Sequence, residues 1–433
     1  MNSLLPTAAR CAAAFVALLS LSGVAAPPLA AQQSAGSFYA PLLKSKPKVE
    51  DMAELGRVLF MDKRLSASGQ VACASCHDPA RAFGPPVGLS IARAGADGRS
   101  MGLRAVPSLR YRQTVPPFTL SFHEGEADVT DQGPAGGHTW DGRAGSAHEQ
   151  ARLPLFSPLE MANRSPAELL AKVRAAGHGA ALERLFGADL FKDEALALNA
   201  VLLVLEVYQQ TPASFSPFSS KYDAVLRGQT QLSAAEARGL ELFRRPDKGN
   251  CALCHVADIK EGAFPLFTDW GYVALGVPRN RALAANRNPA WFDLGLCGPL
   301  RTDLQARKDL CGQFRTPSLR NVALREQFFH NGAITGLEAA VRFYATRDTD
   351  PAAWYPAGRQ GAPRRFDDMP AQYHGNVTTD PPFDRHPGQR PALSAADVRD
   401  IVAFLKTLTD ADAVPAAVNP TRGKASTARA VKP

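Results

Sequence analysis

The sequence predicts a mainly α-helical fold with long irregular loops, arranged as two similar domains. Three observations predict it: helix-start signals followed by apolar residues at helical spacing, a scarcity of strand patterns, and an internal repeat. Gly- and Pro-rich stretches at 78–138 and 256–317 separate the helical segments. Loops of this length are unusual in a compact domain unless something orders them.

Serines that can cap a helix stand at Ser165, Ser233 and Ser394. The first two have Glu three residues later, which predicts a capping box, and a proline follows Ser165 at the first helical position. Apolar residues at helical spacing follow Ser394, and residues 194–208 form a further apolar helix. These signals predict helices in both halves of the chain.

The internal repeat joins residues 54–77 to residues 236–255. Each copy reads as a short amphipathic helix, a polar turn and then Cys-x-x-Cys-His. One structural unit is therefore used twice. We expect an N-terminal domain over 37–228 and a C-terminal domain over 229–412.

The Cys-x-x-Cys-His motif attaches haem through two thioether bonds, and its histidine becomes an axial ligand of the iron. The spacing lets both sulfurs reach the vinyl groups while the histidine turns beneath the iron. The sequence therefore predicts two covalent haem c groups in two cytochrome c-like haem domains, and the haems would order the long loops. The residues concerned are Cys73, Cys76 and His77, and Cys251, Cys254 and His255.

Residues 1–31 are typical of a secretory signal peptide: Arg10 precedes the apolar run Cys11–Leu21, and small residues suited to cleavage follow. A membrane anchor is the alternative, but the run is too short to span a bilayer. We expect cleavage and a periplasmic protein with no transmembrane anchor. The tail at 413–433 is rich in Ala, Pro, Arg and Lys and is predicted to be disordered.

Cys297 and Cys311 lie outside the haem motifs. In an oxidising compartment they can form a disulfide, although two separate buried thiols would also fit the spacing. The net charge is +8, and +7 without residues 1–31. This charge favours an acidic partner protein. Dispersed basic residues in an exported chain argue against nucleic acid.

Further segments carry a resemblance to the bacterial dihaem cytochrome c peroxidases. They are Trp140-Asp141-Gly142-Arg143-Ala144, Glu149-Gln150-Ala151 with Pro154, Pro158-Leu159-Glu160-Met161, Phe314 to Val322, and Phe329-His330-Asn331-Gly332. With both haem motifs they span roughly residues 45–410 in the family's order.

The resemblance implies roles for five of these residues. Glu160 resembles the distal acid/base that moves a proton as the peroxide O–O bond breaks. Gln150 and Pro154 match further positions of the distal pocket. Trp140 matches the tryptophan that relays electrons between the haems. His330 would hydrogen-bond beside the second haem and not ligate its iron.

The second haem separates two branches of the family. Fourteen residues after His330 the peroxidase branch has a methionine ligand, but this chain has Tyr344. A tyrosine there resembles the MauG branch, and phenolate stabilises ferric and higher iron states. Met369 and His374 are rival ligands in a loop.

The first haem is predicted to be open on its distal side. The family's capping histidine would follow the first haem motif, yet residues 78–122 contain no histidine. His123, His138 and His148 come later, and a histidine in such loops is more often structural than a ligand.

The resemblance also implies a calcium ion between the domains, bound by the backbone carbonyls of Arg325 and Gln327. Tyr111 falls where the family has an asparagine ligand, so calcium is left open.

The function expected from these residues is that of a MauG-like enzyme. Hydrogen peroxide reacts at the His77 haem, and the oxidising equivalents are stored over both haems and used on a donor, such as a protein side chain. The MauG branch has a surface Trp just before the second haem motif, but residues 246–250 here contain no aromatic. The alternatives are a cytochrome c peroxidase that removes peroxide with electrons from a small cytochrome, and a non-enzymatic dihaem electron carrier.

Overall fold

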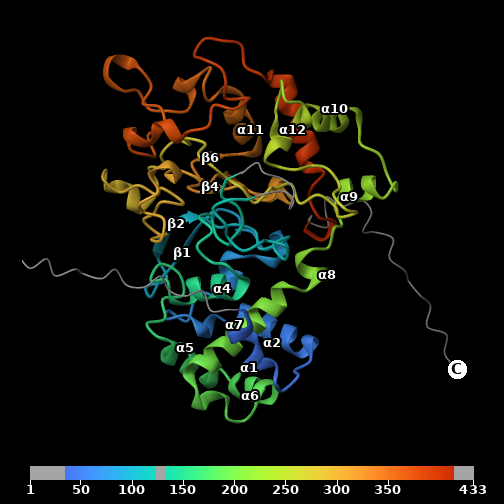
Figure 1. Ribbon diagram of the computed structural model, residues 1–433, viewed down its shortest axis with the longest axis vertical. Helices are drawn as coiled ribbons and strands as arrows, with labels where there is room; N and C mark the ends of the chain where they lie inside the picture. Colours follow the sequence, from blue (N-terminus) through green and yellow to red (C-terminus); the bar gives the residue numbers. More distant parts are fainter. Residues whose placement is uncertain (1–34, 123–132, 414–433) are drawn as a thin grey trace, which may run out of the picture.

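The computed structural model describes residues 35–122 and 133–413, and within them the protein is mainly helical, as predicted. Helices of the first half lie in the lower part of Figure 1 and those of the second half in the upper part. The first half contains α1 (Ala35–Leu43), α2 (Val49–Met61), α3 (Cys73–Cys76), α4 (Ala147–Phe156), α5 (Pro166–Ala175), α6 (Gly179–Phe186), α7 (Glu194–Gln209) and α8 (Pro212–Phe215). The second half contains α9 (Lys221–Leu226), α10 (Ala234–Arg244), α11 (Leu337–Thr346) and α12 (Ala395–Lys406).

Each half has its own hydrophobic core. The first core is built around α7, which is apolar on nearly all faces and is surrounded by α2, α4 and α5. The second core lies between α10, α11 and α12. The two cores follow one another along the chain, which agrees with two domains. Tyr222 of α9 belongs to the second core, although α9 lies within the range 37–228 predicted for the first domain. The exact division stays a prediction.

The two copies of the internal repeat pack in the same way, because the helix before each haem motif has a glycine where it crosses a later helix of its half. A Cβ added to Gly56 of α2 would lie 1.9 Å from the carbonyl oxygen of Val204 in α7. A Cβ on Gly239 of α10 would lie 2.0 Å from the carbonyl oxygen of Asp400 in α12. Only glycine permits the two helix backbones to come this close. Each helix that carries one of these glycines is followed by a haem motif.

The helix caps form where the sequence predicts them, with one difference. Ser233 and Ser394 complete capping boxes. Ser165 accepts a hydrogen bond from the backbone N–H of Glu168, but the Glu168 carboxylate binds the backbone and guanidinium of Arg164 instead of the Ser165 backbone. The capping box expected at Ser165 is therefore only half formed, because the neighbouring cation attracts the carboxylate.

The described strands form three antiparallel ribbons of two strands each. They are β1 (Ile91–Ala94) with β2 (Ser100–Ala105), β3 (Tyr272–Val273) with β4 (Phe314–Arg315), and β5 (Gln327–Phe328) with β6 (Ile334–Thr335). β1 and β2 lie near the middle of the molecule, where the two halves meet (Figure 1). The long loops are thus anchored where the halves join.

A buried polar network at Asp410 links the halves. Its carboxylate accepts hydrogen bonds from Arg110, at 2.8 Å, and from the Tyr111 hydroxyl, at 2.6 Å, both in the first half. It also accepts one from Asn321 of the second half, at 2.7 Å. Ser219 adds longer contacts at 3.4 and 3.5 Å, and because Asp410 is fully buried its charge depends on such neighbouring groups.

Some expectations fall outside the described residues: the signal peptide at 1–31, His123 and nearly all of the tail at 413–433. Among the residues that are described, no helix is long and apolar enough to cross a membrane.

The close helix crossing at Gly239 leads to a prediction about the stability of the protein. Gly239→Ala should lower the free energy of unfolding by about 2–3 kcal/mol, because the added methyl meets a backbone carbonyl that cannot move aside. Urea denaturation of the haem-loaded protein measures this. Gly375→Ala is the matched control, since nothing lies within 4 Å of a Cβ at that position. Equal stability of the two variants would contradict the close crossing.

Candidate functional site

The first haem motif lies on the short helix α3, which follows α2 directly after a polar turn. The ring nitrogen Nδ1 of His77 donates to the carbonyl oxygen of Phe83, at 3.2 Å. Burial lowers the pKa of His77 to about 4, so the ring is neutral at pH 7. Its Nε2 lone pair is therefore available to bind iron.

The second motif repeats this arrangement. Cys251 begins a 3-10 turn (Cys251–Leu253), and Nδ1 of His255 donates to the carbonyl oxygen of Phe267, at 2.9 Å. Burial lowers the pKa of His255 to about 4 as well. Phe83 and Phe267 both have a positive φ, near 55°, which turns each carbonyl toward its histidine.

A second internal repeat fixes the loops that bind these two histidines. It was not predicted from the sequence. Residues 107–110 and 317–320 both read Pro-Ser-Leu-Arg. The Ser108 hydroxyl donates to the carbonyl of Ala82, at 2.7 Å, and the Ser318 hydroxyl donates to that of Leu266, at 2.6 Å. Each serine thus fixes the loop whose next carbonyl holds the histidine. Comparing the two four-residue motifs would have found this.

The arginines of this second repeat are buried and paired with carboxylates. Arg110 binds Asp410, as described above, and Arg320 forms two hydrogen bonds with Asp223, at 2.9 and 3.0 Å. Arg320 and Asp223 are almost completely buried. These ion pairs hold in place the two loops that follow the Pro-Ser-Leu-Arg motifs.

A large, mostly apolar cavity lies beside His255 and extends to the junction of the two halves. Tyr344 of α11 lines it together with the second haem motif. The Tyr344 hydroxyl makes no hydrogen bond to any described residue. Burial raises the pKa of Tyr344, and the neighbouring Cys251 and Cys254 raise it further. A phenolate at this position would therefore require a cation next to it.

The two rival ligands predicted for the second haem, Met369 and His374, differ in where the structure places them. Met369 is buried and lines the same cavity as Tyr344. A ring nitrogen of His374 binds the Met369 carbonyl, at 3.2 Å. His374 is not among the residues that line the cavity. Met369 thus stays a rival by position, while Tyr344 lies near enough to Cys251 and Cys254 for these cysteines to raise its pKa.

His330 also lines the cavity, and its ring stacks on that of Phe314 with centroids 3.4 Å apart. Its Nε2 is buried without a hydrogen bond and lies 3.7 Å from a carboxylate oxygen of Asp368. Within residues 35–122 and 133–413 no group satisfies this nitrogen, so the predicted hydrogen-bonding role of His330 stays a prediction.

The predicted distal residues of the first haem gather around α4. Gln150 and Pro154 stand one turn apart on this helix, on the same face. The turn after α4 brings Glu160 back, because the Met161 N–H donates to the Pro154 carbonyl, at 3.0 Å. Burial raises the pKa of the Glu160 carboxyl. Burial, and then the Glu160 charge, raise the pKa of Cys76 to about 11, so Glu160 faces the first haem motif.

Trp140 lines the cavity where the two halves meet. Its indole N–H donates to the carbonyl of Ala105 in β2, at 2.8 Å, and its own carbonyl accepts from the Arg315 N–H of β4, at 2.9 Å. The following turn needs Gly142, which has a φ of 65°; a Cβ there would lie 2.0 Å from the Tyr272 hydroxyl. The indole is thus fixed between the halves.

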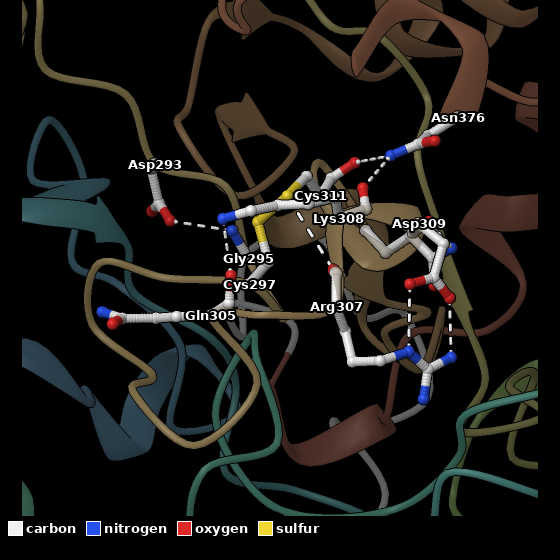
Figure 2. The surroundings of a disulfide bond; sticks show 10 residues. Asp293, Gly295, Cys297, Gln305, Arg307, Lys308, Asp309, Cys311 and Asn376 are labelled. Carbon is white, nitrogen blue, oxygen red and sulfur yellow. Dashed lines mark hydrogen bonds and ion pairs between the residues drawn. A yellow bond between two sulfur atoms is a disulfide. The ribbon is translucent and has the colours of Figure 1, made fainter. Parts of the chain in front are cut away.

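The structure joins Cys297 and Cys311 in a disulfide, one of the two alternatives that the sequence left open. Figure 2 shows that the Asn376 side chain holds the loop by donating to the carbonyls of Lys308 and Cys311, at 2.8 and 3.0 Å. Within this disulfide loop, Arg301 donates to the backbone carbonyl of Asp141, at 2.9 Å. The disulfide therefore braces the turn that carries Trp140.

The later histidines of the first half are structural. His148 stacks on Phe38 and binds the Glu206 carboxylate, at 2.8 Å. His138 is buried, and its Nδ1 lies 3.1 Å from the Arg112 guanidinium. Burial, and then Arg112, lower the pKa of His138 to about 2.

The residues present fit two haems. All four cysteines of the motifs are free thiols, and each motif histidine offers Nε2. A hydroxyl without a hydrogen bond faces the second motif, from Tyr344. Buried N–H groups of Arg315 and Arg325, which line the cavity, have no hydrogen-bond partner among the described residues. A haem would supply iron to the histidines and carboxylates to the arginines.

Comparison with known proteins agrees with this geometry. A family model described as di-haem cytochrome c peroxidase matches residues 50–231. The methylamine utilization protein MauG of Paracoccus denitrificans is 36% identical over 310 residues, which cover 70% of this chain and 76% of that protein. The cytochrome c551 peroxidase of Nitrosomonas europaea is 28% identical over 75% of this chain and 82% of its own length.

A solved structure is similar over most of the chain. The diheme peroxidase BthA from Burkholderia thailandensis is 43% identical, with a TM-score of 0.74, and the match covers 87% of this chain and 90% of that one. The chain therefore belongs to the di-haem cytochrome c peroxidase and MauG family, and it is a peroxidase-like oxidoreductase that holds two haems.

Proposed function

We propose that the protein is a MauG-like enzyme of the periplasm, with two haem c groups attached through Cys73 and Cys76 and through Cys251 and Cys254. It uses hydrogen peroxide at the His77 haem and draws electrons from a redox partner. The observation that carries the MauG-like assignment is Tyr344, whose hydroxyl has no hydrogen bond within the described residues and lines the cavity beside His255.

Haem iron supplies the redox chemistry of peroxide reduction at the first motif. The chain supplies the proton movement. Glu160 can take the proton of the oxygen that approaches the iron and return it to the oxygen that leaves. Its raised pKa suits both steps, since a carboxyl that ionises nearer to neutral pH both accepts and releases a proton readily. Gln150 and Pro154 shape this side of the site.

The second haem has a different task in this proposal. His255 and Tyr344 are its two ligands, and an anionic oxygen ligand favours oxidised iron. Trp140 lies between the halves with its N–H held by Ala105, which suits it to pass electrons between the two sites. Both oxidising equivalents of peroxide can then be kept until the donor arrives.

The donor is proposed to be a redox partner or substrate protein, and the positive net charge favours an acidic surface on it. Residues 246–250 contain no aromatic, so the route by which electrons enter differs from that of the MauG branch.

The second candidate is an ordinary cytochrome c peroxidase, and one observation favours it: Met369 lines the same cavity as Tyr344. If Met369 were the ligand, the second haem would have a higher reduction potential and would serve as an electron entry site.

Spectroscopy before and after peroxide tests the proposal. The purified oxidised protein should contain one high-spin haem and one low-spin haem with His/Tyr ligation, and peroxide should change the absorption of both. Two low-spin haems that do not react with peroxide would show that the protein is an electron carrier. Rapid turnover with reduced cytochrome c would favour the second candidate.

Replacing the proposed acid/base should slow the first step. Glu160→Gln should lower the rate constant for reaction with peroxide by roughly 10²- to 10⁴-fold, because no carboxyl then moves the proton. The wild-type rate should fall as the pH drops through the raised pKa of Glu160, above the ordinary value for Glu, and the variant should lack this dependence. Glu241→Gln, at a largely exposed position, is the control in stopped-flow measurements. An unchanged rate in the Glu160 variant would exclude the role.

The second-haem ligand is tested by a pair of substitutions. Tyr344→Met should raise the reduction potential of the second haem, since a thioether favours ferrous iron more than a phenolate does. Met369→Leu should leave the potential and the low-spin spectrum unchanged. Spectroelectrochemical titration measures both variants. The opposite pattern, with only the Met369 variant shifted, would identify Met369 as the ligand.

A further inference from the structure

Three arginines at the junction of the halves have no carboxylate partner among the described residues: Arg112, Arg315 and Arg325. All three line the cavity. Arg315 donates to the carbonyl of Gly137, at 3.1 Å, and its buried Nε has no partner. Arg325 donates to the carbonyl of Val106, at 2.9 Å, and its buried Nη2 has no partner.

Arg112 completes the group. In the part of the chain that the structure describes, its side chain makes one hydrogen bond, to His138, at 3.1 Å. The charges of Arg112 and Arg315 act on each other, and those of Arg112 and Arg325 both act on His77. The three cations therefore lie close to the first haem motif and to Trp140.

Other buried arginines of the protein show how unusual this is. Arg104 binds Asp293 through two hydrogen bonds, at 2.6 and 2.8 Å, and also Asp141. Asp141, whose charge acts on Arg315, is already bound by Arg104 and Arg143. Burying a charge without a carboxylate partner costs several kcal/mol by order of magnitude, and none of the described residues supplies a carboxylate to these three guanidiniums, so an added anion would stabilise them.

We propose that Arg112, Arg315 and Arg325 form one carboxylate-binding site that takes haem propionates at the junction, in place of the divalent cation expected there. Guanidinium groups bind carboxylates through paired N–H donors, which matches the donors without partners. Burial alone lowers the pKa of Arg325 to about 10, and an anion beside it would restore the ordinary value.

A calcium ion does not fit these residues. Calcium requires six to eight oxygen ligands, usually with carboxylates among them. Tyr111, at the position of the expected asparagine, has its hydroxyl bound to Asp410, at 2.6 Å. The described residues contain no cluster of three acidic or other metal-ligating side chains. The expected ligand Arg325 brings a positive charge of its own, which repels a divalent cation.

The inference rests on the proposed binding of two haems, so the test begins by measuring haem content. Arg325→Gln and Arg315→Gln should retain two haems and lower the reduction potential of at least one, because a lost positive charge favours ferric iron. Arg325→Lys should stay near the wild-type potential. Arg245→Gln is the control, because Arg245 is half-exposed and paired with Asp247. Resonance Raman bands of the propionates should shift in the Gln variants only.

Metal analysis of the wild-type protein gives a second readout that needs no variant. Dialysis against EDTA should leave the spectra and potentials unchanged, and calcium should be well below one ion per chain. A stoichiometric calcium whose removal alters the spectra would overturn the proposal. So would Gln variants whose potentials and Raman bands match those of the Arg245 control. A protein without haem would instead refute the proposed function itself.

Discussion

The contact between helix backbones at Gly56 and Gly239 is the constraint on which both halves of the protein depend. In each half the helix before the haem motif, α2 or α10, lies so close to the helix that it crosses, α7 or α12, that a Cβ would overlap a carbonyl oxygen. The haem motif begins shortly after the end of α2 or α10. The cores then close around the crossing: Phe60 and Phe243 hold matching places in the repeat, and both are buried. An identical frame therefore presents His77 and His255.

The halves differ on the opposite side of each histidine. In the first half a carboxyl group, Glu160, faces the motif, and His138 and His148 are bound to other partners. In the second half a phenol, Tyr344, stands beside the motif. A carboxyl suits proton transfer, and a phenol suits permanent ligation. The same frame thus supports two unequal sites, and Trp140 lies between them.

Local sequence patterns predicted much of this structure. The features that they did not predict depend on contacts between residues far apart in the chain. Helix caps, the repeat and the haem motifs depend on neighbouring residues, so the sequence alone predicted them. The prediction of a full capping box at Ser165 was wrong in detail, because Arg164 competes for the Glu168 carboxylate. The role of Ser108 and Ser318, and the free guanidinium of Arg325, depend on loops that meet only in the folded chain. The family resemblance supplied the candidates Glu160 and Tyr344, which no spacing rule could have found.

The buried carboxylate of Asp410 has a consequence for the timing of catalysis. It binds residues of both halves at once, and separating them would take the Arg110 cation away from this buried carboxylate, at a cost of roughly 3–5 kcal/mol. A hinge motion of the two halves at this point would therefore cost free energy. The distance between the two haem sites is then fixed in the folded chain. In the proposed function, electron exchange between them depends on that distance and on the driving force, and it does not wait for a domain motion.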